Sequence, residues 1–252
     1  MSIERDLARL TGELPSGLSE GVALGTGLAD GFDLYESAIG QVVVIFNTLG
    51  VSSVDIADDR FPERHTERFR RALLRAEAPS VWRGLIPEAI ERGSPGRLPV
   101  DLRPVTDFQQ QVLLTTATIP KGEVRPYGWV AREVHRPNAV RAVGSAVARN
   151  PIPLIIPCHR VVRTDGHIGN YSLGGPHNKI DLLEHEGADP ERLETLAARH
   201  VRVRADNASG RYCLPTCGVI RSVPPARVTD FRSVAQAEGS GLDPCPVCRP
   251  AD

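Results

Sequence analysis

Cysteine placement is the feature that most limits how this chain can fold. Four of the five cysteines form two close pairs near the end of the sequence, Cys213-x-x-x-Cys217 and Cys245-x-x-Cys248, with 27 residues between the pairs. Four thiolates at such spacing suit the tetrahedral coordination of a structural zinc ion, and a segment this short can hardly fold without one. The pattern predicts a small zinc-binding domain, with disulfide bonds as the alternative.

The fifth cysteine, Cys158, stands apart from the two pairs. It follows an apolar run punctuated by prolines, residues 151–157, which can form neither a regular helix nor a central strand. His159 comes directly after it, and a thiol near a base can become a nucleophile. Free cysteines are also often buried and inert. The sequence therefore predicts one metal site plus one reactive or buried thiol.

Composition limits the class of protein. The chain has 252 residues, of which 41% are hydrophobic, enough for one large domain or two to three small ones. No window approaches the roughly 18 consecutive apolar residues of a membrane span. Charges in residues 1–9 occupy the place of a secretory apolar region. We expect a soluble, cytoplasmic monomer that crosses no membrane.

Charge is unevenly distributed although the net charge is only −1. Residues 125–163 hold seven arginines against one acidic residue, Glu133. Such an island in a nearly neutral protein indicates a polyanionic partner for one face, and a solvated charged surface is the alternative.

In the first hundred residues the pattern predicts a β-hairpin followed by helices. β-Branched runs at Val42–Phe46 and Val51–Ile56 flank a turn, and helical spacing covers Glu63–Ala76 and, briefly, Pro87–Arg92. The glycine- and proline-rich residues 93–96 then indicate a domain boundary.

Helices dominate the predicted middle of the chain. The expected ranges are 106–117, 127–134, 137–149, 176–186 and 190–202. The pair 127–134 and 137–149 is joined by a tight turn, and the second helix is rich in alanine and carries arginines. This arrangement is typical of a helix-turn-helix that presents one helix to a nucleic-acid groove, with an ordinary packing helix as the alternative.

An ordered series of short motifs surrounds Cys158. In chain order they are Phe108-Gln109, Gly122-Glu123-Val124, Tyr127-Gly128, Arg141-Ala142-Val143-Gly144, Asn150-Pro151-Ile152-Pro153, Pro157-Cys158-His159-Arg160-Val161, Tyr171-Ser172 and Leu182-Leu183-Glu184-His185-Glu186-Gly187. Over about 80 residues this series resembles the catalytic domain of the O6-alkylguanine-DNA alkyltransferases, also called methylated-DNA–protein-cysteine methyltransferases. Residues 32–95 weakly resemble the ribonuclease-H-like N-terminal domain of that family.

The resemblance implies a chemical role for each matched residue. Cys158 would take the alkyl group from O6-alkylguanine in one irreversible displacement, and His159 would relay the thiol proton through water toward Glu186. Asn150 would brace the active-site turn. Tyr127 would contact the base or its phosphate and help the guanine leave.

The resemblance also implies how DNA and the damaged base are held. The base would be flipped into a pocket that Tyr171, Ser172 and the backbone of Val161 help to form. The helix 137–149 would enter the minor groove. Arg141 would fill the vacated stack, and the residues expected to contact the DNA with it are Arg136, Ala139 and Tyr127.

The two cysteine pairs carry a second resemblance. Residues 211–217, 231, 235–238 and 243–250 look like the zinc domain of the bacterial adaptive-response protein Ada. There the first cysteine both ligates zinc and accepts methyl from DNA phosphotriesters. By position that acceptor would be Cys213. In this chain the module lies at the C-terminal end, without the regulatory helix-turn-helix domain that follows it in Ada.

Together these observations predict an α+β protein of three parts. They are a ribonuclease-H-like β-domain over 1–100, a helical DNA-binding alkyltransferase domain with a helix-turn-helix over 101–190, and an Ada-type zinc domain with four cysteine ligands over 203–252. The expected partner is double-stranded DNA containing O6-alkylguanine, and the expected cofactor is Zn²⁺. Two alternatives are a sensor or regulator that binds lesions without repairing them, and a cysteine hydrolase that uses Cys158 and His159.

Overall fold

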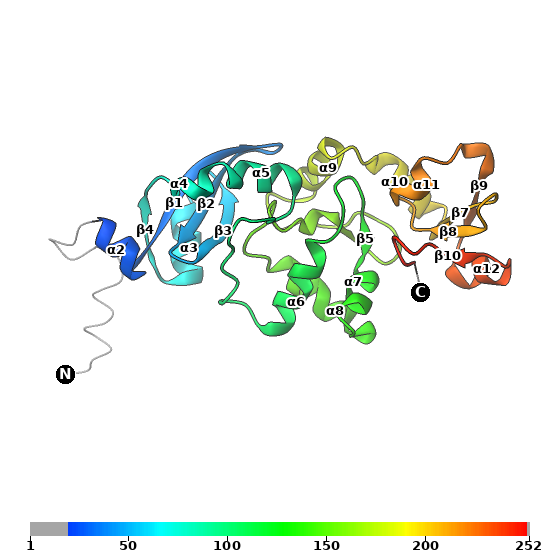
Figure 1. Ribbon diagram of the computed structural model, residues 1–252, viewed down its shortest axis with the longest axis horizontal. Helices are drawn as coiled ribbons and strands as arrows, with labels where there is room; N and C mark the ends of the chain where they lie inside the picture. The colour runs from blue at the N-terminus through cyan, green and yellow to red at the C-terminus, as the bar shows by residue number, and fades with distance from the viewer. Residues whose placement is uncertain (1–19, 251–252) are drawn as a thin grey trace. The chain divides into compact units, whose positions relative to one another are not determined.

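The computed structural model describes residues 20–250, which form a mixed α+β fold (Figure 1). The chain divides into two compact units. The first contains the residues up to Val105 together with Pro151–Ile155, and the second contains Thr106–Asn150 and the residues from Ile156 onward. Within the described range, no helix is long and apolar enough to cross a membrane.

A four-stranded sheet is the centre of the first unit. Its order is β3-β2-β1-β4, in which β1 pairs antiparallel with β2 and parallel with β4, and β2 pairs antiparallel with β3. The strands are β1 (Ala29–Ser37), β2 (Gly40–Asn47), β3 (Gly50–Ile56) and β4 (Ala72–Arg75). The side chains of residues 42–46 are buried, so the hairpin predicted from the β-branched run is confirmed.

The helices of the first unit are α2 (Glu20–Thr26), α3 (Phe61–Phe69), α4 (Ser80–Arg83) and α5 (Leu85–Arg92). The helix predicted over 63–76 is wrong in its second half. α3 ends where Arg70 takes a left-handed conformation with φ of 54°, and residues 72–75 form β4. Pairing with the edge of β1 outweighs the helical spacing of the side chains there, because a short apolar run fits either structure.

The second unit begins with the predicted helices. They are α6 (Asp107–Thr116), α7 (Tyr127–Glu133), α8 (Val140–Ala148), α9 (Pro176–His185) and α10 (Pro190–Ala198). Thr106 caps α6 through a bond from the Gln109 N–H to its hydroxyl. Pro137 opens a 3-10 turn, η2 (Pro137–Ala139), that leads into α8. α10 ends four residues before the predicted end at 202.

Two short strands place the region around Cys158. β5 (Arg125–Pro126) pairs parallel with β6 (Val161–Val162), and the 3-10 turn η3 (Cys158–Arg160) directly precedes β6. The turn that carries Cys158 and His159 is therefore linked through β6 to β5, the strand that leads into α7.

The last part of the second unit, residues 203–250, is called here the four-cysteine domain. Its sheet has the order β10-β8-β7-β9, and its core includes Val203, Ala205, Tyr212, Val234 and Ala237. The elements are β7 (Val203–Asp206), β8 (Arg211–Cys213), α11 (Gly218–Arg221), η4 (Pro225–Arg227), β9 (Val228–Phe231), α12 (Val234–Gly239) and β10 (Asp243–Pro244).

Candidate active site

Cys158 lies in the wall of a pocket of about 410 Å³. Its side chain is buried, with 3% of the residue surface exposed. Asn150 braces the turn before it by donating from Nδ2 to the Ile156 carbonyl at 2.8 Å. The pocket is lined by Tyr127, Val147, Ala148, Cys158, Arg163, Gly169, Asn170, Tyr171 and Ser172. The thiol is thus set in a fixed turn at the edge of a cavity.

His159 is held by Glu186 on one side only. Its Nε2 lies 2.8 Å from Glu186 Oε1, whereas its Nδ1 is buried and has no partner among the described residues. Because an ionised carboxylate only accepts hydrogen bonds, Nε2 carries the proton and Nδ1 presents its lone pair. Burial lowers the pKa of His159 more than the neighbouring carboxylate raises it, so the imidazole is neutral at pH 7. This arrangement leaves Nδ1 as a base.

Arg160 shares the Glu186 carboxylate with His159. Its Nε and Nη2 donate to the two oxygens at 2.9 and 2.7 Å, and its Nη1 donates to the Ile119 carbonyl at 2.7 Å. Burial would raise the pKa of Glu186, but the hydrogen bonds from His159 and Arg160 outweigh it and hold the pKa at about 2. Glu186 is therefore ionised at neutral pH.

Lys179 supplies a buried cation to the same region. Its Nζ donates to the carbonyls of Val161 and Ile168 at 2.7 and 2.8 Å, and only 1% of the residue is exposed. Burial lowers its pKa to about 8. Burial raises the pKa of the Cys158 thiol, while Asn150 and the charge of Lys179 lower it. The thiol is predominantly protonated at pH 7, so attack requires a base.

The structure brings most of the predicted pocket residues together. Tyr127, at the start of α7, and Tyr171 and Ser172, in the loop before α9, all line the cavity beside Cys158. The buried hydroxyl of Tyr171 has no oxygen or nitrogen partner among the described residues. Val161 does not line the cavity, since its side chain is fully buried and its carbonyl accepts the bond from Lys179.

Three of the predicted DNA-contacting residues, Arg136, Ala139 and Arg141, lie between the end of α7 and the first turn of α8, and the fourth, Tyr127, begins α7. Arg136 and Arg141 are exposed, and no described residue pairs with either side chain, while Ala139 is half-buried. Val143, Ala146 and Val147 bury the opposite face of α8, and its exposed face carries small side chains such as Ala142 and Ser145. A duplex can approach such a face closely.

The four cysteines of the C-terminal domain converge on one point. The sulfurs of Cys213, Cys217, Cys245 and Cys248 all lie within 4.8 Å of one another, and all four residues are buried. One ion with Zn–S bonds of about 2.3 Å can reach such a set. The Leu214 N–H also points to the sulfur of Cys248 at 3.3 Å, as expected where a thiolate is present.

Comparison with known proteins identifies the family. Residues 107–188 match the model of the 6-O-methylguanine DNA methyltransferase DNA-binding domain. A methylated-DNA–protein-cysteine methyltransferase of Methanosarcina barkeri is 35% identical over 153 residues, which cover 57% of this chain and 89% of that protein. The chain belongs to the methylated-DNA–protein-cysteine methyltransferase family.

Other family members resemble the chain over shorter parts of their length. The bifunctional transcriptional activator/DNA repair enzyme Ada of Escherichia coli is 36% identical over 173 residues, 67% of this chain, and the Mycobacterium leprae methyltransferase is 51% identical over 81 residues, 32% of this chain. The chain spans about half the length of these two relatives, 48% of each. A Mycobacterium tuberculosis OGT structure in complex with DNA matches with a TM-score of 0.51 and 31% identity, over 65% of this chain and 98% of that one.

Two residues of this methyltransferase-family site are missing from the sequence prediction. In the sequence, Arg160 stands out only as part of the motif around Cys158, and no role is predicted for Lys179. A signal existed for Lys179, because the chain has only two lysines among 30 basic residues, and this one falls on the predicted helix 176–186. No spacing rule shows that Arg160 turns inward to Glu186, 26 residues away.

Proposed function

We propose that this chain repairs O6-alkylguanine in double-stranded DNA by moving the alkyl group to Cys158. The observation that carries the proposal is the placement of Cys158 in the wall of a cavity lined by Tyr127, Tyr171 and Ser172, beside a neutral histidine. A pocket of this kind accepts a single flipped base, which is how a protein thiol reaches an atom inside a duplex.

Proton removal from the thiol is the first step of the proposed reaction. The Cys158 proton passes through a water molecule to the free Nδ1 of His159, and Glu186 stabilises the imidazolium that forms. Glu186 is suited to this role because it stays ionised. The charge of Lys179 favours the thiolate as it develops.

Alkyl transfer is a single displacement at carbon. The thiolate sulfur attacks the alkyl carbon, an S–C bond forms, and the C–O6 bond breaks with its electron pair leaving on the guanine. The guanine anion takes up a proton, for which the Tyr127 hydroxyl at the pocket wall is the proposed donor. A thioether offers water no good leaving group, so each molecule acts once and no turnover follows.

DNA binding is assigned to the pair α7 and α8, which we interpret as a helix-turn-helix. The exposed small side chains of α8 suit close approach in the minor groove, and Arg141, which is exposed near the start of α8, would fill the space that a flipped base leaves. Arg136 and Ala139 lie beside it as further contacts. Val147 and Ala148, at the other end of α8, line the Cys158 pocket. The same helix would therefore contact the minor groove at one end and the cavity at the other.

The remaining parts of the proposal concern architecture and cofactor. We interpret the first unit as a ribonuclease-H-like domain and the four-cysteine domain as an Ada-type module that holds Zn²⁺ through Cys213, Cys217, Cys245 and Cys248. Zinc would fix the loops that carry these residues. A monomer suffices, since one chain supplies every group used, and a reducing cytoplasm would keep Cys158 as a thiol.

Mass spectrometry tests the proposed transfer directly. The zinc-loaded protein is mixed with excess duplex DNA containing one O6-methylguanine, and its intact mass and peptides are measured. We expect one added methyl on Cys158, none with undamaged duplex and none in Cys158→Ala. A lesion-bound protein with unmodified Cys158 would contradict the proposal and favour the sensor alternative.

Methyl acceptance from phosphotriesters at Cys213 is a separate part of the proposal. The resemblance of residues 211–217 and 243–250 to the zinc domain of Ada motivates it, together with the convergence of the four cysteines. The same mass measurement with a methylphosphotriester duplex tests it. Cys213 is only 1% exposed, so the residues that cover its sulfur would have to move before DNA could reach it.

A further inference from the structure

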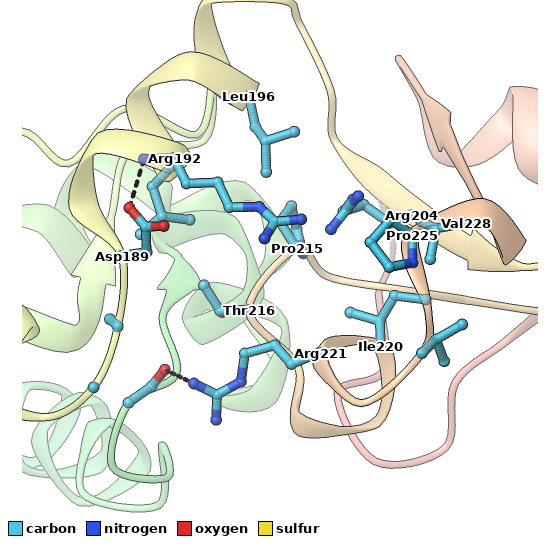
Figure 2. A pocket seen from close by; sticks show the side chains of 15 residues that line it. Asp189, Arg192, Leu196, Arg204, Pro215, Thr216, Ile220, Arg221, Pro225 and Val228 are labelled. Carbon is cyan, nitrogen blue, oxygen red and sulfur yellow. Dashed lines mark hydrogen bonds between the residues drawn. The ribbon is translucent and has the colours of Figure 1, made fainter.

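Residues 122–125 lie between the candidate active site and the four-cysteine domain. Gly122 donates its N–H to Glu186 Oε2 at 3.3 Å, and its carbonyl accepts from Nη1 of Arg221 at 3.0 Å, the lower dashed line in Figure 2. Its φ is +74°, and a Cβ there would lie 2.7 Å from the Glu186 carbonyl oxygen. One residue, Gly122, therefore joins Arg221 of the four-cysteine domain to the carboxylate that orients His159.

The next residues bind the same domain more tightly. The Glu123 carboxylate accepts the N–H of Gly218 at 2.8 Å, directly after Cys217, and pairs with Arg125. The N–H and carbonyl of Val124 both bond to the hydroxyl of Thr216, at 2.9 and 3.1 Å. Glu123 and Arg125 are both buried, so this contact belongs to the interior of the unit.

A second contact reaches the other cysteine pair. The indole N–H of Trp129, in α7, donates to the carbonyl of Cys248 at 2.8 Å. The guanidinium groups of Arg125 and Arg249 lie over the same ring, at 5.5 and 5.9 Å from its centroid. The residues on either side of Cys217 thus bond to one end of the segment 122–129, and the Cys248 carbonyl bonds to the other end.

The loop between Cys213 and Cys217 is covered by these contacts. Cys213 and Cys217 are 1% and 0% exposed, and Leu214 and Thr216 are 6% exposed each. A DNA phosphate could reach the Cys213 sulfur only if this loop moved aside. The arrangement suits a domain that supports its neighbour.

We propose that the four-cysteine domain positions the candidate active site, with Arg221 acting through Gly122 to set the Glu186 carboxylate against His159. Zinc at the cysteines would keep Arg221 in a fixed position relative to the 122–129 segment. This positioning role rests on the proposed alkyl transfer, because Glu186 matters only if His159 receives the thiol proton. Arg221 touches no reacting atom, so it is a positioning residue.

Single-turnover kinetics on the zinc-loaded full chain test the role of Arg221. We compare the wild type with Arg221→Ala, Arg221→Lys and the control Arg211→Ala, which removes an exposed arginine from β8 of the same domain. At saturating O6-methylguanine duplex, we expect Arg221→Ala to slow methyl transfer roughly tenfold to a hundredfold, as small misplacements of reacting groups do. Its DNA affinity and zinc content should match the wild type, Arg221→Lys should recover most of the rate, and Arg211→Ala should change nothing.

Fluorescence supplies a readout that does not depend on transfer. The chain has two tryptophans, so Trp82→Phe leaves Trp129 as the sole reporter at the contact with Cys248. Removing zinc with a chelator should shift Trp129 emission to longer wavelength and slow transfer in otherwise wild-type protein, and added zinc should reverse both changes. In Arg221→Ala, zinc removal should slow transfer little further, because the link to Gly122 is already lost.

The outcomes separate the positioning role from the reaction on which it rests. Wild-type protein that leaves Cys158 unmethylated overturns the proposed function and the positioning role with it. Normal transfer by the wild type and by Arg221→Ala at equal rates overturns the positioning role alone. If Arg221→Ala unfolds, Arg221→Gln replaces it, since glutamine keeps a shorter, neutral donor.

Discussion

The Glu186 carboxylate forms a buried ion pair with Arg160 and also accepts the hydrogen bond that orients His159. Arg160 Nη2 and His159 Nε2 lie 2.7 and 2.8 Å from one oxygen, Glu186 Oε1, and the Arg160 side chain is 1% exposed. The carboxylate therefore has a structural partner and a proposed catalytic partner. Any change at this position affects stability and chemistry together.

Replacing Glu186 with glutamine should show both effects. Glu186→Gln leaves the buried Arg160 guanidinium without its counter-charge, which costs about 3 kcal/mol of unfolding free energy. It also removes the charge that stabilises the His159 imidazolium, so transfer should slow by roughly a hundredfold. Urea denaturation and single-turnover transfer measure the two effects. The control is Glu184→Gln, an exposed position on the same helix that should leave both unchanged.

The rate of alkyl transfer should be insensitive to pH across the usual titration range of histidine. Burial keeps the folded pKa of His159 below its ordinary value of 6.5, so the imidazole remains a neutral base as the pH falls past 6.5. On the acid side the rate should decline only below this range, when Nδ1 becomes protonated, whereas towards pH 8 the loss of the Lys179 charge should make the thiolate less favourable. Single-turnover transfer between pH 5 and pH 8 checks this, and a rate that halves near 6.5 would show that His159 is not held as described.

Lys179 should control the acidity of the nucleophile. Lys179→Met removes the cation that favours the thiolate, so the pKa of Cys158 should rise above its value in the wild type. The pH dependence of Cys158 alkylation by iodoacetamide, followed by peptide mapping, measures the change. The exposed Lys121, the only other lysine, provides the control Lys121→Met. Equal pKa values in the two variants would rule out this role.

Arg141 should contribute to DNA binding without contributing to stability. It is exposed and has no partner among the described residues, so Arg141→Ala should leave the melting temperature unchanged. Affinity for a lesion-bearing duplex should fall roughly tenfold, about 1.4 kcal/mol. Fluorescence anisotropy on Cys158→Ala protein, which cannot react, measures the affinity. Arg97→Ala removes an exposed arginine of the first unit, and equal losses from both variants would make the effect one of net charge only.

Trp129 should help to retain the metal that we assign to the four cysteines. Trp129→Phe keeps an aromatic side chain but removes the indole N–H that donates to the Cys248 carbonyl at 2.8 Å. The loss of one buried hydrogen bond costs about 1 kcal/mol, which corresponds to roughly fivefold weaker zinc binding if the bond forms only in the zinc-loaded fold. Competition with a coloured chelator reports the affinity. Zinc retained equally by the variant and the wild type would contradict the coupling.

Local sequence patterns predicted those parts of the fold whose side-chain periodicity and end signals agree. The hairpin around residues 47–50 and the helix that starts after Thr106 are examples, because β-branched runs and a capping hydroxyl act through neighbours in the chain. The strand at residues 72–75 could not be predicted in this way. It exists because β1 offers it an edge, and that edge lies about 40 residues earlier.

The candidate site shows the same division between local and distant information. The motif around Cys158 indicated the thiol, the histidine and Glu186, and the cysteine spacing indicated a metal site that the four sulfurs fit. The inward turn of Arg160 and the bonds from Thr216 to Val124 depend on packing between distant segments. No spacing in the sequence carries that information.

The path of the chain just before Cys158 limits how the two compact units could be separated in evolution. Residues 151–155 pack within the first unit, where the Pro151 carbonyl accepts the N–H of Val54 at 2.9 Å, and the chain then returns to the second unit at Ile156. A fragment that starts at Thr106 would carry Ile152, Leu154 and Ile155 without the surroundings that bury them. The two units are therefore not consecutive in the sequence, because residues 151–155 of the first unit interrupt the second. Recombination could therefore exchange the two units only as a matched pair.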